Sequence, residues 1–207
     1  LFSFASRMNL LFLFCFYAPV VLVIAIQSVL YDGWRQMFFI YPSFVLLAIY
    51  GIYRITTIDK FKYPVYALVG VTFLMMISFM VSNFPFQHVY FNRLVKSTPE
   101  HRRKNYEQDY WGTSFKQSLE YILAHDNSNR IKIYPEISPG KYNVLMLPEK
   151  DRERIDLVSR EEANYIITNY RWRPYDYTEL KDYKYHQFLV ANSTVSEIFY
   201  RPDTRLP

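Results

Sequence analysis

Residues 30–42 read LYDGWRQMFFIYP and form a short polar interruption between two long apolar runs. The preceding run, residues 9–27 (NLLFLFCFYAPVVLVIAIQ), contains no charged residue, and Pro19 is expected to kink it. A helix of about 20 apolar residues is long enough to cross the ~30 Å hydrocarbon core of a bilayer. The polar interruption therefore lies where one predicted membrane helix ends and the next begins.

Two further apolar runs follow the polar stretch. The second predicted span covers about Met37–Tyr53 and is aromatic at both ends, as expected at membrane interfaces. The third covers about Tyr66–Val81 with its flanks and is uncharged. A single run of this kind also fits a buried helix of a soluble protein, but three in succession favour a membrane region of about three transmembrane helices.

The positions of the basic residues predict the orientation of these spans. Arg7 precedes the first span, and Arg54, Lys60 and Lys62 lie in the predicted loop between the second and the third. The positive-inside rule places both segments in the cytoplasm, although Arg35 counts against this bias. We therefore expect an integral protein of the inner (plasma) membrane whose polar hairpin and C-terminal part are periplasmic or otherwise extracytoplasmic.

The composition changes after residue 84. Residues 1–84 hold five basic and two acidic groups, whereas residues 85–207 hold 19 and 17 and resemble an ordinary soluble domain. The pattern predicts a helix capped by Thr113 or Ser114 and running to about Ala124, and a short helix over residues 142–147. Strands are predicted over residues 130–134, 165–168, 188–190 and 195–200, with a turn at residues 192–193.

These elements indicate a small extracytoplasmic α/β domain on a membrane base. We divide the chain into a transmembrane helical region (residues 1–84), an interfacial connector (85–112) and the α/β domain (113–207). Because the sequence begins with Leu1, we interpret it as the C-terminal piece of a larger polytopic protein or as a chain without its beginning. The only cysteine, Cys15, lies in an apolar run, so no disulfide forms within the chain.

Several function classes find no support in the sequence. It contains no glycine-rich phosphate loop, nucleophile elbow or His-Glu-x-x-His motif. His88 and His101 have no partner at metal-ligand spacing, so no metal site is predicted. The basic triplet at residues 102–104 lies among acidic residues, and we do not expect nucleic acid as a partner.

Arg35 is the best candidate for binding a ligand. A guanidinium at the end of a membrane helix can hold a phosphate in two-point geometry, in surroundings where that contact is strong. Asp32 could orient Arg35, bind a sugar hydroxyl or help to bind a cation, and Tyr31 and Trp34 could stack on a sugar ring. In the alternative interpretation, Asp32 and Arg35 pair with each other and the rings anchor the helix end.

A second candidate is the segment Asp109-Tyr110-Trp111-Gly112. Sugar-binding sites often combine ring stacking with hydrogen bonds to a carboxylate, which would assign Trp111 and Asp109 to sugar contact. The alternative is a turn at the start of a helix, with Trp111 packed into the small domain. No complete catalytic set is present in the predicted soluble domain, so the catalytic residues are unknown.

Four stretches resemble one family. The polar stretch LYDGWR with FFIYP resembles the late external loop of bacterial polytopic glycosyltransferases of GT-C architecture, which are similar to protein O-mannosyltransferases and the aminoarabinose lipid A transferase. Residues 83–92 (NFPFQHVYFN), 109–116 (DYWGTSFK) and 165–171 (YIITNYR) resemble later parts of the same enzymes. Gln36 departs from the family pattern, in which histidine commonly follows the arginine.

The resemblance implies an enzyme that transfers a sugar from a polyprenyl-phosphate carrier to an extracytoplasmic acceptor. Arg35 would contact the donor phosphate and Asp32 would support the site, while the usual catalytic aspartate would lie in an earlier loop that this sequence lacks. The partners would be a lipid-linked sugar donor, membrane lipids and an acceptor that the sequence does not identify, and a divalent cation is the one candidate cofactor. The competing hypothesis is a non-enzymatic, membrane-anchored subunit whose soluble domain binds a partner.

Overall fold

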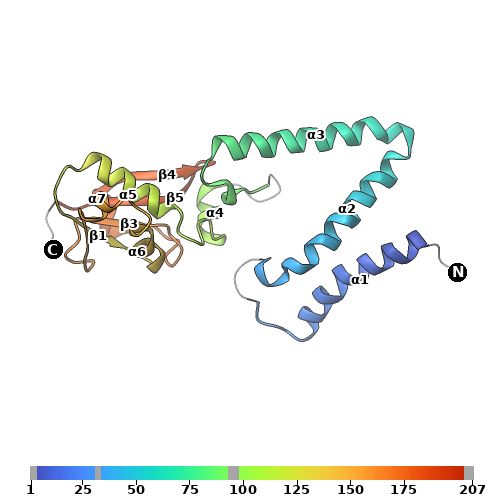
Figure 1. Cartoon of the computed structure of the whole chain (residues 1–207), viewed down its shortest axis with the longest axis horizontal. Coiled ribbons are helices and arrows are strands. Elements are labelled where there is room, and N and C mark those ends of the chain that lie inside the picture. The colour runs from blue at the N-terminus through green and yellow to red at the C-terminus, as the bar shows by residue number, and fades with distance from the viewer. Residues whose placement is uncertain (1–3, 31–33, 93–97, 203–207) are drawn as a thin grey trace. The chain divides into compact units, whose positions relative to one another are not determined.

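A computed structural model describes residues 4–30, 34–92 and 98–202 of the chain. These residues fall into two compact units that divide between Met76 and Ile77, and each unit is considered by itself. The first contains long apolar helices, and the second is a small α/β domain with a five-stranded sheet (Figure 1). The predicted order of a helical region followed by an α/β domain is confirmed.

The helical elements are α1 (Phe4–Ala25), the 3-10 helix η1 (Trp34–Ile40), α2 (Tyr41–Thr56) and α3 (Asp59–Ser82). Among the described residues, three segments are long and apolar enough to cross a membrane: Ser6–Ala25, Arg35–Thr56 and Asp59–Ser82. They agree with the three predicted spans in number and order. Helices α1 and α2 contact each other.

Two details of this region differ from the sequence prediction. The second span starts as a 3-10 helix at Trp34 and becomes α-helical at Tyr41, where Pro42 occupies a first-turn position that needs no backbone N–H donor. Helix α3 starts at Asp59, so Lys60 and Lys62 lie in its first turns and not in a loop. A carboxylate at a helix start interacts favourably with the positive end of the helix dipole, which favours this earlier beginning.

The second unit contains a mixed sheet. Its strands are β1 (Ile131–Pro135), β2 (Ile155–Leu157), β3 (Tyr165–Thr168), β4 (Lys184–Val190) and β5 (Ser193–Tyr200). They lie in the order β2-β1-β3-β5-β4, with β1 parallel to β2 and β3, and β5 antiparallel to β3 and β4. The helical elements are η2 (Gln87–Val89), α4 (Pro99–Asn105), α5 (Ser114–His125), α6 (Ser138–Val144), α7 (Glu149–Arg152) and η3 (Thr178–Tyr183).

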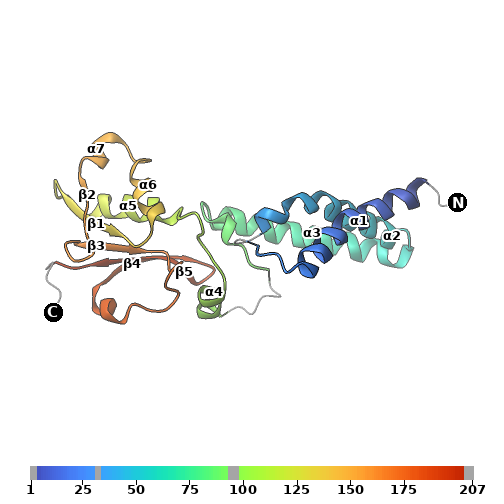
Figure 2. The same cartoon turned by 90° about the horizontal axis from the view of Figure 1, so that it is seen from below.

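Each face of the sheet buries its own apolar cluster. On one face, α5 packs Phe115, Leu119 and Ile122 against strand residues that include Ile133 and Ile167. On the other face, residues of η3 and the segments around it cover the sheet; this cluster is formed by Ala163, Ile166, Tyr170, Tyr177, Leu180 and Phe199. Figure 2 shows α5 and the η3 segment on opposite sides of the strands. Successive strand residues alternate between the two faces, as a pleated strand requires.

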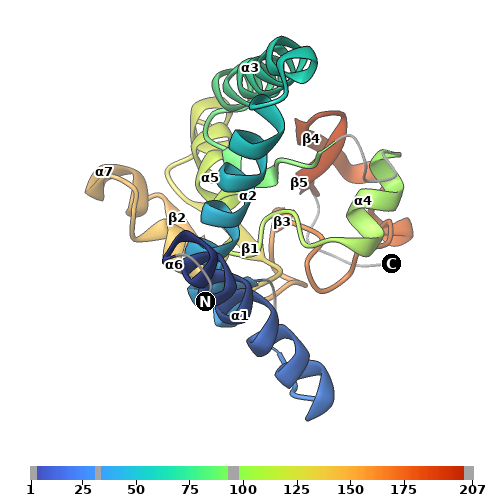
Figure 3. The same cartoon turned by 90° about the vertical axis from the view of Figure 1, so that its right-hand side faces the viewer.

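Helix α4 lies against β5 and the turn that precedes it (Figure 3). Arg102 is buried on this helix and donates a hydrogen bond to the backbone carbonyl of Ala191. Just beyond the helix, the Gln108 amide donates to the Ser193 hydroxyl at 2.7 Å. These contacts hold the segment that connects α4 to α5 at the edge of the domain.

Three local predictions in this domain need correction. The short helix predicted over residues 142–147 spans Ser138–Val144, because Pro139 favours the first turn of a helix. Strand β4 begins at Lys184, four residues before its predicted start, and β2 was not predicted. Thr113 stands at the cap position of α5 but makes no side-chain capping hydrogen bond; Asp109 supplies those bonds instead.

Candidate functional site

The polar hairpin is described only in part. Tyr31 and Asp32 lie outside the described residues, so their predicted roles remain predictions. Trp34 opens η1, but its side chain is not described. Arg35 follows it in η1 and is exposed. The predicted contact of Arg35 with a donor phosphate also remains a prediction.

An apolar cavity lies beside η1. It has a volume of about 450 Å³ and is lined by Phe16 of α1 and by residues of η1 and α2, namely Phe38, Ile40, Tyr41 and Phe44. The ring centroids of Phe16 and Phe44 are 5.4 Å apart, and those of Phe38 and Tyr41 are 5.5 Å apart. The 3-10 helix that carries Arg35 therefore also supplies part of an aromatic wall.

Asp109 is fully buried and organises the start of α5. One carboxylate oxygen accepts hydrogen bonds from the Thr113 backbone N–H and hydroxyl, both at 2.8 Å, and the other accepts from the Ser114 N–H at 2.9 Å and from its hydroxyl. His88 Nε2 lies 3.5 Å from the same carboxylate. Burial opposes the charged form, but the hydrogen bonds from His88, Ser114 and Thr113 outweigh it and lower the pKa of the Asp109 carboxyl.

Gly112 and Trp111 complete this segment. Gly112 has a φ of +69°, and a Cβ there would lie 2.8 Å from the Pro139 Cβ, so both the backbone conformation and the space require glycine. Trp111 is 65% exposed and meets Tyr110 edge-on, with ring centroids 4.9 Å apart. The segment thus turns its carboxylate into the domain and its tryptophan toward solvent. The predicted sugar contacts of Asp109 and Trp111 remain predictions.

The turn after β3 places further aromatic and charged groups next to this segment. The Arg171 guanidinium carbon lies 3.9 Å from the Tyr110 ring centroid and 5.6 Å from that of Trp172. Arg171 Nε also donates to the Glu107 carboxylate at 3.1 Å. We call Trp111, Tyr110, Arg171 and Trp172 the aromatic row. The sequence singled out Trp111 but not Arg171 or Trp172, because only the fold brings the two segments together.

A pocket of about 170 Å³ adjoins the aromatic row. Most of its lining is polar, and the residues come from the end of α4 and the segment after it, from the turn after β3 and from β5: Arg103, Lys104, Asn105, Tyr106, Glu107, Gln108, Asn169, Tyr170, Arg171, Pro174 and Thr194. We call it the α4 pocket. Asn169 Nδ2 donates to the Asp109 carbonyl at 2.8 Å and fixes the two walls to each other.

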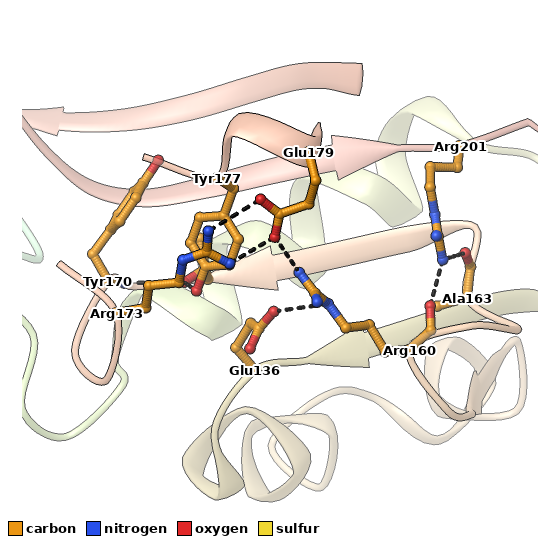
Figure 4. A network of polar contacts seen from close by, with 9 residues as sticks. Glu136, Arg160, Ala163, Tyr170, Arg173, Tyr177, Glu179 and Arg201 are labelled. Carbon is orange, nitrogen blue, oxygen red and sulfur yellow. Dashed lines mark hydrogen bonds and ion pairs between the residues drawn. The ribbon is translucent and has the colours of Figure 1, made fainter. Parts of the chain in front are cut away.

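A separate ionic network lies at the end of β1 (Figure 4). Both Glu179 oxygens accept from Arg173, at 2.6 and 3.0 Å, and Arg160 bridges Glu179 at 3.1 Å and Glu136 at 3.3 Å. The hydrogen bonds from Arg173, with that from Arg160, lower the pKa of Glu179 to about 2. Burial raises the pKa of Glu136 despite its two arginine neighbours. Each charge is balanced within the network, which indicates a structural role.

Within the described ranges, no group of three or more His, Cys, Asp and Glu side chains is placed to hold a metal ion. Asp32, the residue considered for a cation, is not among those residues. We compared the chain with protein-family models, with curated proteins and with solved structures, and none of the three comparisons found a match.

Proposed function

We propose that this chain is the C-terminal part of an integral-membrane glycosyltransferase that moves a sugar from a polyprenyl-phosphate carrier to an extracytoplasmic acceptor. The observation that supports this function best is that η1 carries both an exposed arginine, Arg35, and two walls of the apolar cavity, Phe38 and Ile40. A carrier lipid needs both kinds of group, one for its chain and one for its phosphate.

The two ends of such a carrier require different chemistry. An isoprenoid chain is apolar and branched, and aromatic walls such as Phe16 and Phe44 offer it dispersion contacts without any polar group to desolvate. A phosphate is best held by a guanidinium, which can donate two parallel hydrogen bonds to it. When the sugar leaves, negative charge grows on that phosphate, and an arginine placed there stabilises the transition state.

The proposed topology agrees with this assignment. Arg7 lies at the start of the first segment of membrane-spanning length, and Arg54, Lys60 and Lys62 lie where the second ends and the third begins. By the positive-inside rule, these ends would be cytoplasmic, and η1 and the α/β domain would lie outside the cytoplasm. The membrane would be the inner or plasma membrane. The resemblance of residues 30–42, 83–92, 109–116 and 165–171 to GT-C enzymes supports the same function.

Lipid binding by the whole chain in nanodiscs tests the proposed role of Arg35. A polyprenyl phosphate should bind more tightly than the polyprenol of equal length. Arg35→Ala should weaken binding of the phosphate by roughly 10- to 100-fold, the expected range for one charge-assisted contact, and leave binding of the alcohol unchanged. Arg35→Lys should fall in between, because an ammonium group cannot make the two-point contact.

Arg54→Ala is the matched control, because Arg54 is also exposed but lies in the last turn of α2. Equal affinity for the phosphate and the alcohol, or an equal loss in the Arg54 variant, would refute the assignment. The transfer step itself is tested by measuring the mass and N-terminus of the native polypeptide and then its turnover of the carrier-linked sugar. A native chain that begins at Leu1 would favour the membrane-anchored subunit instead.

A further inference from the structure

We propose that the α/β domain binds a neutral saccharide in the α4 pocket, with Trp172 as the ring on which a sugar stacks. This inference goes beyond the proposed transferase and does not depend on it, because it concerns a separate part of the chain. It rests on the position of the pocket, its charge balance and the exposed rings beside it.

The pocket lies at the carboxyl end of β3, one of the three parallel strands. Ligand sites of α/β sheets lie preferentially at this edge, where the turns that follow the strands converge. Here Asn169, Tyr170 and Arg171 directly follow β3 and form one wall. The opposite wall, residues 103–108, is tied to the domain through Gln108 and Ser193. The pocket is therefore built from fixed backbone segments.

The charges around the pocket are balanced. Arg103 pairs with Asp176 at 2.6 Å, Lys104 pairs with Glu100, and Arg171 pairs with Glu107 at 3.1 Å. An anionic ligand such as phosphate would have to compete with a carboxylate for each cation. A neutral polar ligand would leave all three ion pairs intact, so the balance favours an uncharged partner.

The pocket residues also keep unused hydrogen-bonding capacity of both kinds. Among the described residues, the buried Oε1 of Gln108 and the buried Nε of Arg103 have no hydrogen-bond partner. One atom is an acceptor and the other a donor. Asn105, Asn169 and Thr194 also line the pocket, and their side chains carry groups that donate and groups that accept, as hydroxyl groups do. A ligand with several hydroxyl groups matches this lining.

Exposed rings lie on the two segments that form the pocket walls. Trp172 is 77% exposed, and Tyr175 (61%) and Tyr106 (42%) lie on the same two segments. A pyranose ring has one face of C–H groups, and the negative face of an indole attracts these weakly positive hydrogens. The Arg171 guanidinium contacts the rings of both Tyr110 and Trp172 and so links them in the aromatic row. The row continues to Trp111 and could contact a second sugar unit.

The backbone at Tyr170 supports a functional turn. Its φ is +61°, a left-handed conformation that is rare for a bulky residue. Strained residues of this kind cluster at ligand sites, where the surrounding contacts hold them in place. Tyr170 is 3% exposed and donates its hydroxyl hydrogen to Glu197, whereas Trp172 two residues later is exposed to solvent. The turn thus presents Trp172 to solvent next to a residue that is held in place.

Glycan binding by the whole chain in lipid nanodiscs tests this proposal. The probes are chitotriose, maltotriose and mannotriose, measured by saturation-transfer NMR and calorimetry. We expect at least one trisaccharide to bind with little dependence on salt, because the pocket is neutral. Trp172→Ala should weaken that binding by roughly 10-fold, since truncating an aromatic anchor of a binding site typically costs at least about this factor. Trp172→Phe should retain most of the affinity, because it keeps a ring.

Tyr142→Ala is the control, because Tyr142 is an equally exposed ring (66%) on α6 outside the pocket. The proposal is overturned if none of the three trisaccharides binds, or if Trp172→Ala binds as well as the wild type. It is also overturned if inorganic phosphate displaces the sugar, which would indicate an anion site. A Trp172-dependent attachment to protein-free vesicles, without trisaccharide binding, would assign the rings to a membrane surface and refute it as well.

Discussion

Replacing Asp109 with alanine should strongly destabilise the α/β domain. The carboxylate accepts hydrogen bonds from the backbone N–H and the hydroxyl of both Thr113 and Ser114 at the start of α5. Its side chain has no exposed surface, so water cannot take its place without opening the structure. The variant would leave these donors without an acceptor and remove the cap of the helix that covers one face of the sheet.

The magnitude follows from which donors are buried. The Ser114 N–H and hydroxyl are buried, and an unsatisfied buried group costs about 1–3 kcal/mol. Thr113 is exposed, so water can satisfy its donors at little cost. The sum is a loss of about 2–6 kcal/mol, a large part of the ~5–15 kcal/mol that stabilises a typical domain. Asp109→Asn should recover only part of this, because one of its two oxygens becomes a donor.

Urea unfolding of the whole chain in detergent, followed by tryptophan fluorescence, measures this loss. Trp111 lies two residues from Asp109 and reports on the same segment. Glu120→Ala is the control, because Glu120 is an exposed carboxylate of the same helix and its ion pair with Lys116 should contribute less than about 1 kcal/mol. If Asp109→Ala lowers the free energy of unfolding by no more than this control, the capping role is refuted.

Two further predictions concern the same domain. Glu179→Gln should lower the free energy of unfolding by about 1 kcal/mol at pH 7, the upper end for exposed ion pairs. The pKa of Glu179 in the folded protein is lowered to about 2. The difference in stability from the wild type should therefore shrink as the pH falls from about 4.5 and vanish below 2. A pH series of thermal melts would show this, and a difference that persists below pH 2 would contradict it. Gly140→Ala should lower the free energy of unfolding in urea by about 1–3 kcal/mol, because the new Cβ would lie 2.4 Å from Pro135 and 2.8 Å from Phe115. An unchanged urea midpoint would show that the backbone shifts freely there.

The parts of the fold that were predicted from sequence have strong local signals. Phe115, Leu119 and Ile122 recur at helical spacing, and all three are buried on α5. Residues 131–133 alternate buried and exposed as predicted for a strand. The turn predicted at residues 192–193 lies one residue earlier: Ala191 and Asn192 both have positive φ angles, as a tight two-residue hairpin requires, and Ser193 already belongs to β5. In each case, residues close in sequence determine the structure.

The parts that were missed depend on distant partners. Strand β2 has only three residues beside a charged segment, and it becomes a strand because β1 offers it a parallel edge. The aromatic row joins Tyr110 to Arg171, which is 61 residues further along the chain. No periodicity or spacing rule can pair such segments. The proposed site at Arg35 was predicted from sequence because its residues are adjacent along the chain.

The segment 109–112 shows how one motif can serve two purposes that its composition alone does not separate. A carboxylate next to two rings suggested one sugar site, yet the Asp109 carboxylate points into the domain while its carbonyl accepts from Asn169 at 2.8 Å. Asn169 immediately precedes the strained Tyr170 and the exposed Trp172. Asp109 therefore supports α5 through its side chain and the proposed saccharide site through its backbone. Asp109→Ala keeps the backbone carbonyl that binds Asn169. It should therefore weaken trisaccharide binding only to the extent that the loss of the side-chain bonds shifts or unfolds the segment, whereas Trp172→Ala should weaken binding without loss of stability.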